Sequence, residues 1–221
     1  MKFDVITIFP EIFEGLLKES ILGKAQNKKL ISIKIHQLRK WAKDKHQMVD
    51  DRPFGGGPGM VLKIEPIFRA IKQLKLKGKE KARIVLLSPR GKKFNTTMAK
   101  KFAKYNQLIF ICGRYEGIDE RVSEKIADEA ISVGDYITIG GEIPAMAIIE
   151  AVSRFIPGVI GKKESVEKYD YPQYTRPEIF HPNSKSQMSK VRRMWPIPKV
   201  LISGNHKKIK EWRSRHSKII E

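Results

Sequence analysis

Three apolar runs, each followed directly by a turn, are the feature that most constrains how this chain can fold. Residues 83–87, 108–112 and 129–133 have the composition of buried strands, and residues 96–105 and 118–127, between them, have the pattern of helices. Strands that alternate with helices predict an α/β layer fold with a mainly parallel sheet.

The same alternation extends toward both ends of the chain. We expect strands at residues 2–9 and 31–35, and helices at residues 10–22, from Pro66 onward, at 143–155 and at 205–219. Residues 157–200 are rich in proline and hold few apolar runs, so we interpret them as a linker before the last helix.

The turns after the three buried strands stand where ligands bind in folds of this class. They cover residues 87–91, 112–117 and 133–144, and each contains glycine. In open α/β sheets, ligands collect beyond the carboxyl ends of the strands, so we expect the three turns to form one composite pocket. None of them has the G-x-G-x-x-G spacing of a dinucleotide-binding site.

A further loop, residues 50–60, carries four glycines in five positions, which lets its backbone approach a ligand closely. It is not a phosphate-binding P-loop, because no Lys-Ser/Thr pair follows at the required spacing. The histidines show no metal-ligand spacing, and the sequence has no nucleophile elbow. The single cysteine, Cys112, excludes a disulfide within one chain and is expected in a buried strand.

The chain carries a large excess of positive charge. Its 44 Lys and Arg oppose 24 Asp and Glu, which gives a formal net charge of +20, and residues 185–218 contain a single acid, Glu211. Such an excess favours a polyanionic partner and indicates nucleic-acid binding. No apolar stretch approaches the roughly 20 residues needed to cross a bilayer, and no signal peptide is visible. We therefore expect a cytoplasmic protein that does not associate with a membrane.

The sequence also carries six motifs in a fixed order: DRPFGGGPGM at residues 51–60, CGRYEGIDER at 112–121, GDY at 134–136, GGE at 140–142, YPQYTRP at 171–177 and SGNH at 203–206. In this order they closely resemble the bacterial TrmD family of tRNA (guanine-N1)-methyltransferases, and the resemblance covers nearly the whole chain.

This resemblance implies an α/β fold of the SPOUT class, whose parallel sheet ends in a deep C-terminal trefoil knot, followed by a small, mainly helical C-terminal domain. It places a knotted methyltransferase domain at residues 1–158, a linker at 159–180 and a basic tRNA-binding domain at 181–221. It further implies a homodimer with a shared active site. The implied reaction moves a methyl group from S-adenosyl-L-methionine to the N1 nitrogen of guanosine 37 in tRNA, next to the anticodon.

The resemblance also assigns residues to the site. The expected cofactor contacts come from the three turns: Leu87, Gly113, Tyr115, Val133, Gly134, Asp135, Tyr136, Ile137, Thr138, Gly140, Gly141 and Pro144. The expected catalytic residues are Arg154, Asp170, Glu164 and Glu116. Without the resemblance, we would interpret Arg154 as a positive charge near the C-terminal end of a helix, where it complements the helix dipole. The family is associated with magnesium, but we assign no residue as a metal ligand.

The linker departs from the family pattern. The family carries an Asp-Ser-Phe segment whose aspartate is the proposed general base, and residues 161–171 contain no such segment. Glu164, Glu167 and Asp170 are the carboxylates available there, and the sequence does not choose between them. Two alternatives therefore stay open: a related SPOUT enzyme acting on another RNA position, and a tRNA-binding relative with impaired catalysis.

Overall fold

The computed structural model describes residues 1–75, 81–161, 171–182 and 194–217, and the chain divides into two compact units, Met1–Val166 and Glu167–Glu221. Within the first unit, five strands form one parallel sheet in the order β2-β1-β6-β5-β7. The strands are β1 (Lys2–Thr7), β2 (Ser32–Gln37), β5 (Ala82–Lys93), β6 (Gln107–Cys112) and β7 (Glu129–Ser132). The parallel α/β fold predicted from the sequence is confirmed.

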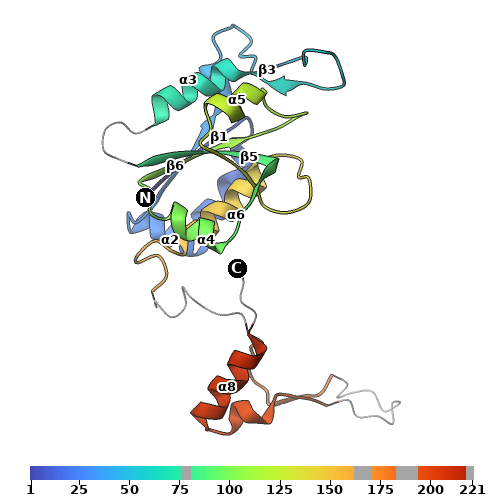
Figure 1. Cartoon of the computed structure of the whole chain (residues 1–221). Helices are drawn as coiled ribbons and strands as arrows, with labels where there is room; N and C mark the ends of the chain where they lie inside the picture. The colour runs from blue at the N-terminus through green and yellow to red at the C-terminus, as the bar shows by residue number, and fades with distance from the viewer. Residues whose placement is uncertain (76–80, 162–170, 183–193, 218–221) are drawn as a thin grey trace. The chain divides into compact units, whose positions relative to one another are not determined.

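Helices cover both faces of this sheet, as Figure 1 shows. One face carries α3 (Ile64–Leu74) and α5 (Glu120–Lys125), and the other carries α2 (Ser20–Asn27), α4 (Thr96–Phe102) and α6 (Glu142–Ser153). Two short strands, β3 (Asp50–Asp51) and β4 (Val61–Leu62), pair antiparallel around the glycine-rich loop. A 3-10 helix, η2 (Leu38–Trp41), follows β2.

The central strand β6 explains why both faces are covered. All six of its residues are buried, and its side chains alternate between two apolar clusters. Leu108 and Phe110 belong to the cluster under α4 and α6, whereas Ile109 and Ile111 belong to the cluster under α3 and α5. This division follows from the two-residue period of a strand, and it holds the carboxyl end of β6 rigidly in the middle of the sheet.

Two predicted boundaries in the first unit are wrong. The predicted helix at 10–22 is a 3-10 helix, η1 (Pro10–Phe13), then α1 (Glu14–Lys18) and then α2, because Glu19 is extended with φ −102° and ψ 168°. This break lets Phe13, on one side of it, and Leu22, on the other, enter the same apolar cluster.

The strand predicted at 83–87 continues as β5 to Lys93. Leu87 and Lys92 are both in register with Ile131, so residues 88–91 form an irregular excursion within one strand rather than a turn that ends it. Gly91 packs so closely on β7 that an added Cβ atom would lie 2.4 Å from the Ile131 backbone nitrogen. Only a glycine leaves room for this packing at residue 91, after which β5 resumes its pairing with β7 at Lys92.

The second unit is small and has ordered structure where the sequence suggested only a linker. β8 (Ile179–Phe180) pairs antiparallel with β9 (Trp195–Pro196), and the 3-10 helix η3 (Lys199–Ile202) precedes α8 (His206–His216). Strands of two residues have no detectable period, which is why the sequence does not reveal them. Ring contacts support this unit: Phe180 lies 5.5 Å from Trp195, and Tyr174 lies 6.1 Å from Trp212, between centroids.

Candidate active site

The three predicted turns meet at the carboxyl edge of the sheet and enclose a cavity of about 580 Å³. Its lining consists of residues 86–90, 113–118, 130–133 and 136–141, with Glu120, Ser123 and Pro144. The volume falls within the range of small-molecule sites in proteins. The composite pocket that the strand ends predicted is therefore present.

Most of the residues expected to contact the cofactor line this cavity, and two do not. Gly134 and Asp135 are absent from its lining. The ring of Tyr136 packs against Gly134, since an added Cβ atom would lie 2.3 Å from it. Asp135 instead forms an exposed ion pair with Lys93 at the end of β5, 2.5 Å apart. Glu116, expected among the catalytic residues, does line the cavity.

Two of the cavity glycines differ in how closely the rest of the protein packs against them. The N–H of Gly141 donates to the carbonyl of Gly113 at 3.0 Å, and a Cβ atom on Gly141 would lie 2.7 Å from the Cα atom of Cys112. The close approach of two backbones therefore demands glycine at Gly141. A Cβ atom on Gly113 would meet nothing closer than 3.6 Å, so the protein itself leaves room there.

The glycine-rich loop at residues 50–60 lies against the turn that follows β6. The N–H of Glu116 donates to the carbonyl of Met60 at 3.0 Å, and that of Leu62 donates to the carbonyl of Gly117 at 3.0 Å. Gly59, at φ +75°, would place a Cβ atom 2.6 Å from Cγ of Glu116. Loop 50–60 thus borders the cavity through Glu116.

An ion pair between a buried carboxylate and a partly exposed arginine connects two of the turns, and the sequence does not predict it. Arg114 Nε donates to Oε2 of Glu142 at 2.9 Å, and the hydroxyl of Thr7 donates to Oε1 of Glu142 at 2.6 Å. The sequence pattern that could have pointed to this pair is that Arg114 and Glu142 fall inside two of the six motifs. No pattern points to Thr7, which is 135 residues from Glu142. Burial, and then the Glu142 carboxylate, raise the pKa of the Cys112 thiol well above its usual value, so this cysteine is not a nucleophile.

Comparison with known proteins places the chain in a family. The family model described as "tRNA (Guanine-1)-methyltransferase TrmD" matches residues 1–219. The chain belongs to the TrmD family. Proteins named tRNA (guanine-N(1)-)-methyltransferase from Geotalea uraniireducens and Dictyoglomus turgidum are each 47% identical to it, over 98% of this chain and 85% of the relative. One from Dehalococcoides mccartyi is 46% identical over 98% of this chain and 86% of the relative.

Of the other catalytic residues that the TrmD resemblance suggested, Arg154 does not line the cavity. Arg154 caps the far end of α6 and lines a second cavity, of about 90 Å³, with Glu19, Glu150 and Ser153 among its neighbours. Asp170 and Glu164 lie outside the described residues, as does the basic insert at 185–193. Within the described ranges, no group of three or more His, Cys, Asp or Glu could hold a metal ion, and no helix is long and apolar enough to cross a membrane.

Proposed function

We propose that this protein transfers a methyl group from S-adenosyl-L-methionine to the N1 nitrogen of guanosine 37 in tRNA. The observation that carries the proposal is the cavity at the carboxyl edge of the sheet, which is lined by residues of three TrmD-family motifs, those at 112–121, 134–136 and 140–142. The relatives that match over 98% of the chain carry the name of the corresponding activity.

The residues of the cavity suit an adenosyl ligand. Gly113 lines the cavity without a side chain, which lets a flat ring approach its backbone, and Leu87, Val133 and Ile137 supply apolar surface around it. The cofactor supplies the methyl group as an electrophile bound to a sulfonium. The protein's task is to hold that group in line with the guanine nitrogen, which lowers the barrier by proximity.

The guanine must also lose a proton, because neutral N1 has no free lone pair. We assign this step to a carboxylate of the linker, Asp170 first and Glu164 second, acting as general base. As the proton leaves N1, negative charge spreads to O6, where the guanidinium of Arg154 stabilises it. Glu167 is the third linker carboxylate, and Glu116, which was expected among the catalytic residues, lines the cavity.

The fold that we propose for the cofactor region is the trefoil knot of the SPOUT class. The close packing of Gly91 on β7 supports it, because there β5 resumes pairing with β7 after the irregular residues 88–91. We also propose a homodimer with a shared site. Ile137, Ile139 and Ile143 are 84%, 89% and 60% exposed at the cavity loop, and exposed apolar groups of this size mark interfaces.

Substrate binding is assigned to the basic second unit together with the cavity. α8 carries three basic residues in its last turn, and the guanidinium of Arg213 lies over the ring of Tyr171, 5.2 Å from its centroid. A net charge of +20 favours the phosphate backbone of tRNA.

Mass spectrometry of a tRNA transcript methylated by the purified protein tests this function. We expect one methyl group on N1 of guanosine 37 and none in a transcript carrying adenosine at position 37. Methylation of a ribose, or of another base, would assign the protein to a different reaction of the same fold. Tight tRNA binding without any methylation would identify a binding protein that has lost catalysis.

A further inference from the structure

Glu142 is a buried carboxylate that the proposed reaction does not use. It is the first residue of α6, and only 1% of it is exposed. Burial of an ionised carboxylate is costly unless the charge is paired and hydrogen-bonded. The position of Glu142, directly after the Gly140-Gly141 turn of the cavity, raises the question of what the charge does there.

Both oxygens of Glu142 are occupied, by donors from two other parts of the chain. Thr7, the last residue of β1, donates its only hydroxyl proton to Oε1, while the same hydroxyl accepts the N–H of Phe9 at 2.9 Å. Arg114, on the turn after β6, donates Nε to Oε2. One carboxylate thus joins the end of β1, the turn after β6 and the start of α6.

The ion pair lies directly behind the cavity wall. A Cβ atom on Gly140 would lie 2.3 Å from Arg114 Nε and 2.5 Å from Glu142 Oε2, so the Gly140 backbone packs on the pair itself. Arg114 lines the cavity, its side chain is 17% exposed, and its guanidinium lies over the ring of Phe9, 4.7 Å from the centroid. Arg114 is therefore held on one side by charge and on the other by an aromatic face.

We propose that Glu142 is a positioning residue for the cofactor, and that it acts through Arg114 to hold the turn after β6 and the Gly140-Gly141 turn at the spacing the ligand requires. This inference rests on the proposed function, because it assumes an adenosyl ligand in the cavity. Loss of the ion pair weakens cofactor binding, since Arg114 and the two turns can then separate, while the general base and Arg154 are untouched.

The test is a double-mutant cycle on the affinity for S-adenosylmethionine, measured by calorimetry with Glu142→Gln, Arg114→Gln and the double variant. Glutamine at 142 keeps the side-chain shape and can still accept from Thr7, so the change is confined to the ion pair. We expect each single variant to raise the Kd about tenfold, and the double variant to do no worse than either, because the two residues act as one unit. Single-turnover rates at saturating cofactor should stay within about threefold of the parent protein.

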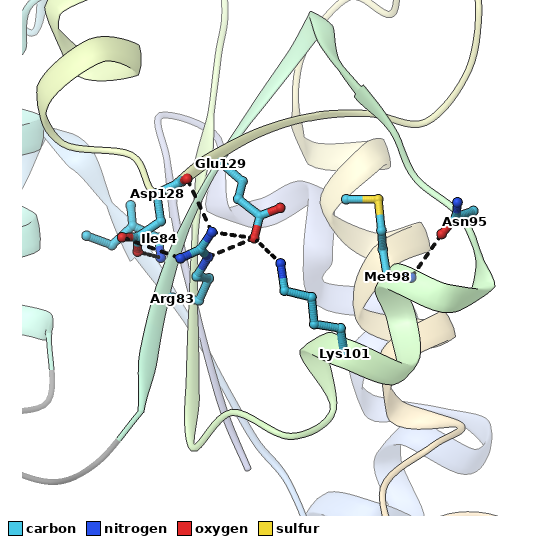
Figure 2. A network of polar contacts seen from close by, with 7 residues as sticks. All are labelled: Arg83, Ile84, Asn95, Met98, Lys101, Asp128 and Glu129. Atoms are coloured by element: carbon cyan, nitrogen blue, oxygen red, sulfur yellow. Dashed lines mark hydrogen bonds and ion pairs between the residues drawn. The ribbon is translucent and has the colours of Figure 1, made fainter.

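Glu129→Gln is the matched control. Glu129 also accepts from two cations, Arg83 and Lys101, at 2.6 and 3.0 Å, as Figure 2 shows, but it does not line the cavity. We expect this variant to lose stability without losing cofactor affinity. Near-normal affinity in folded Glu142→Gln, or additive losses in the cycle, would overturn the proposal.

If Glu142→Gln fails to fold, the double variant decides the matter, because it leaves neither the cation nor the carboxylate buried without its partner, and a folded Arg114→Gln protein adds a second measurement. Normal cofactor affinity in a folded Arg114→Gln protein would then refute the proposed role. Failure of the parent protein itself to bind S-adenosylmethionine would instead refute the proposed function, so the two failures are distinguishable.

Discussion

Gly141 and Arg154 cap opposite ends of α6, with the twelve residues Glu142–Ser153 between them. At 1.5 Å per residue, this helix separates the two by about 18 Å. Gly141 lines the large cavity and Arg154 does not. Under the proposed mechanism, Arg154 would therefore act on a guanine at the cavity of the other subunit in the proposed homodimer.

This separation predicts complementation between two inactive proteins. Arg154→Ala removes the arginine, and Gly113→Val fills the space for the cofactor, so each variant alone should lack methylation activity. In a mixed dimer, the Arg154→Ala subunit supplies an intact cavity and the Gly113→Val subunit supplies Arg154. Methylation activity should therefore return after the two variants are unfolded together and refolded. Absence of any recovery, with mixed dimers demonstrated by differently tagged subunits, would place both functions within one chain.

The two cavity glycines should respond differently to alanine. Gly113→Ala adds a Cβ atom at ordinary distances from the rest of the protein, so the melting temperature should be unchanged while cofactor affinity falls. Gly141→Ala forces a Cβ atom against the Cys112 backbone and should cost about 1–3 kcal/mol of stability as well. Thermal unfolding and calorimetry on the same samples separate these effects; equal stability losses in both variants would contradict the distinction.

The general base is predicted to lie among the linker carboxylates. Asp170→Asn should lower the single-turnover methylation rate by roughly 10²-fold or more, with cofactor and tRNA affinity nearly intact. Glu164→Gln and Glu167→Gln, measured alongside, test the two other linker carboxylates. If all three variants stay within a few-fold of the parent rate, the proton acceptor is elsewhere, and Glu116→Gln becomes the next variant to measure.

Binding of tRNA should be strongly salt-dependent. Neutralising Lys190, Arg192 and Arg193 together should weaken binding and flatten the slope of log affinity against log salt concentration, by roughly 0.7–0.9 for each phosphate that the protein no longer neutralises. Neutralising Lys24, Lys28 and Lys29, in and beside α2 of the first unit, is the charge-matched control. An unchanged slope in the first variant would make that insert a solvated surface.

From the contacts of Glu129 with Arg83 and Lys101, drawn in Figure 2, we predict that the stability of the fold depends on pH. Burial alone would raise the pKa of Glu129, but the hydrogen bonds and charges of Lys101 and Arg83 outweigh it and lower the pKa below 4.5. A carboxyl whose pKa is depressed by folding stabilises the protein above its unfolded pKa, and that stability is lost as the pH falls through the folded pKa. The difference in unfolding free energy between the parent and Glu129→Gln, about 1–2 kcal/mol at pH 7, should shrink below pH 4.5. A difference that is constant from pH 7 to pH 3 would show that the charge is not responsible.

The sequence predicts the sheet and the cavity well because their signals are local. Apolar runs such as 108–112 identify buried strands, and the turn after each run marks the ligand edge. The break at Glu19 could not be predicted, because it is set by how α1 and α2 share one apolar cluster. Nor could the Thr7–Glu142 hydrogen bond, which joins residues that only the finished sheet brings together.

The strand order has a consequence for synthesis on the ribosome. β1 lies between β2, which follows closely in sequence, and β6, whose first residue is Gln107. About seventy residues must be translated after β2 before β6 emerges, which takes several seconds at roughly 5–20 residues per second. During that interval, the edge of β1 that later pairs with β6 has unpaired backbone groups on the nascent chain, and a chaperone could bind there.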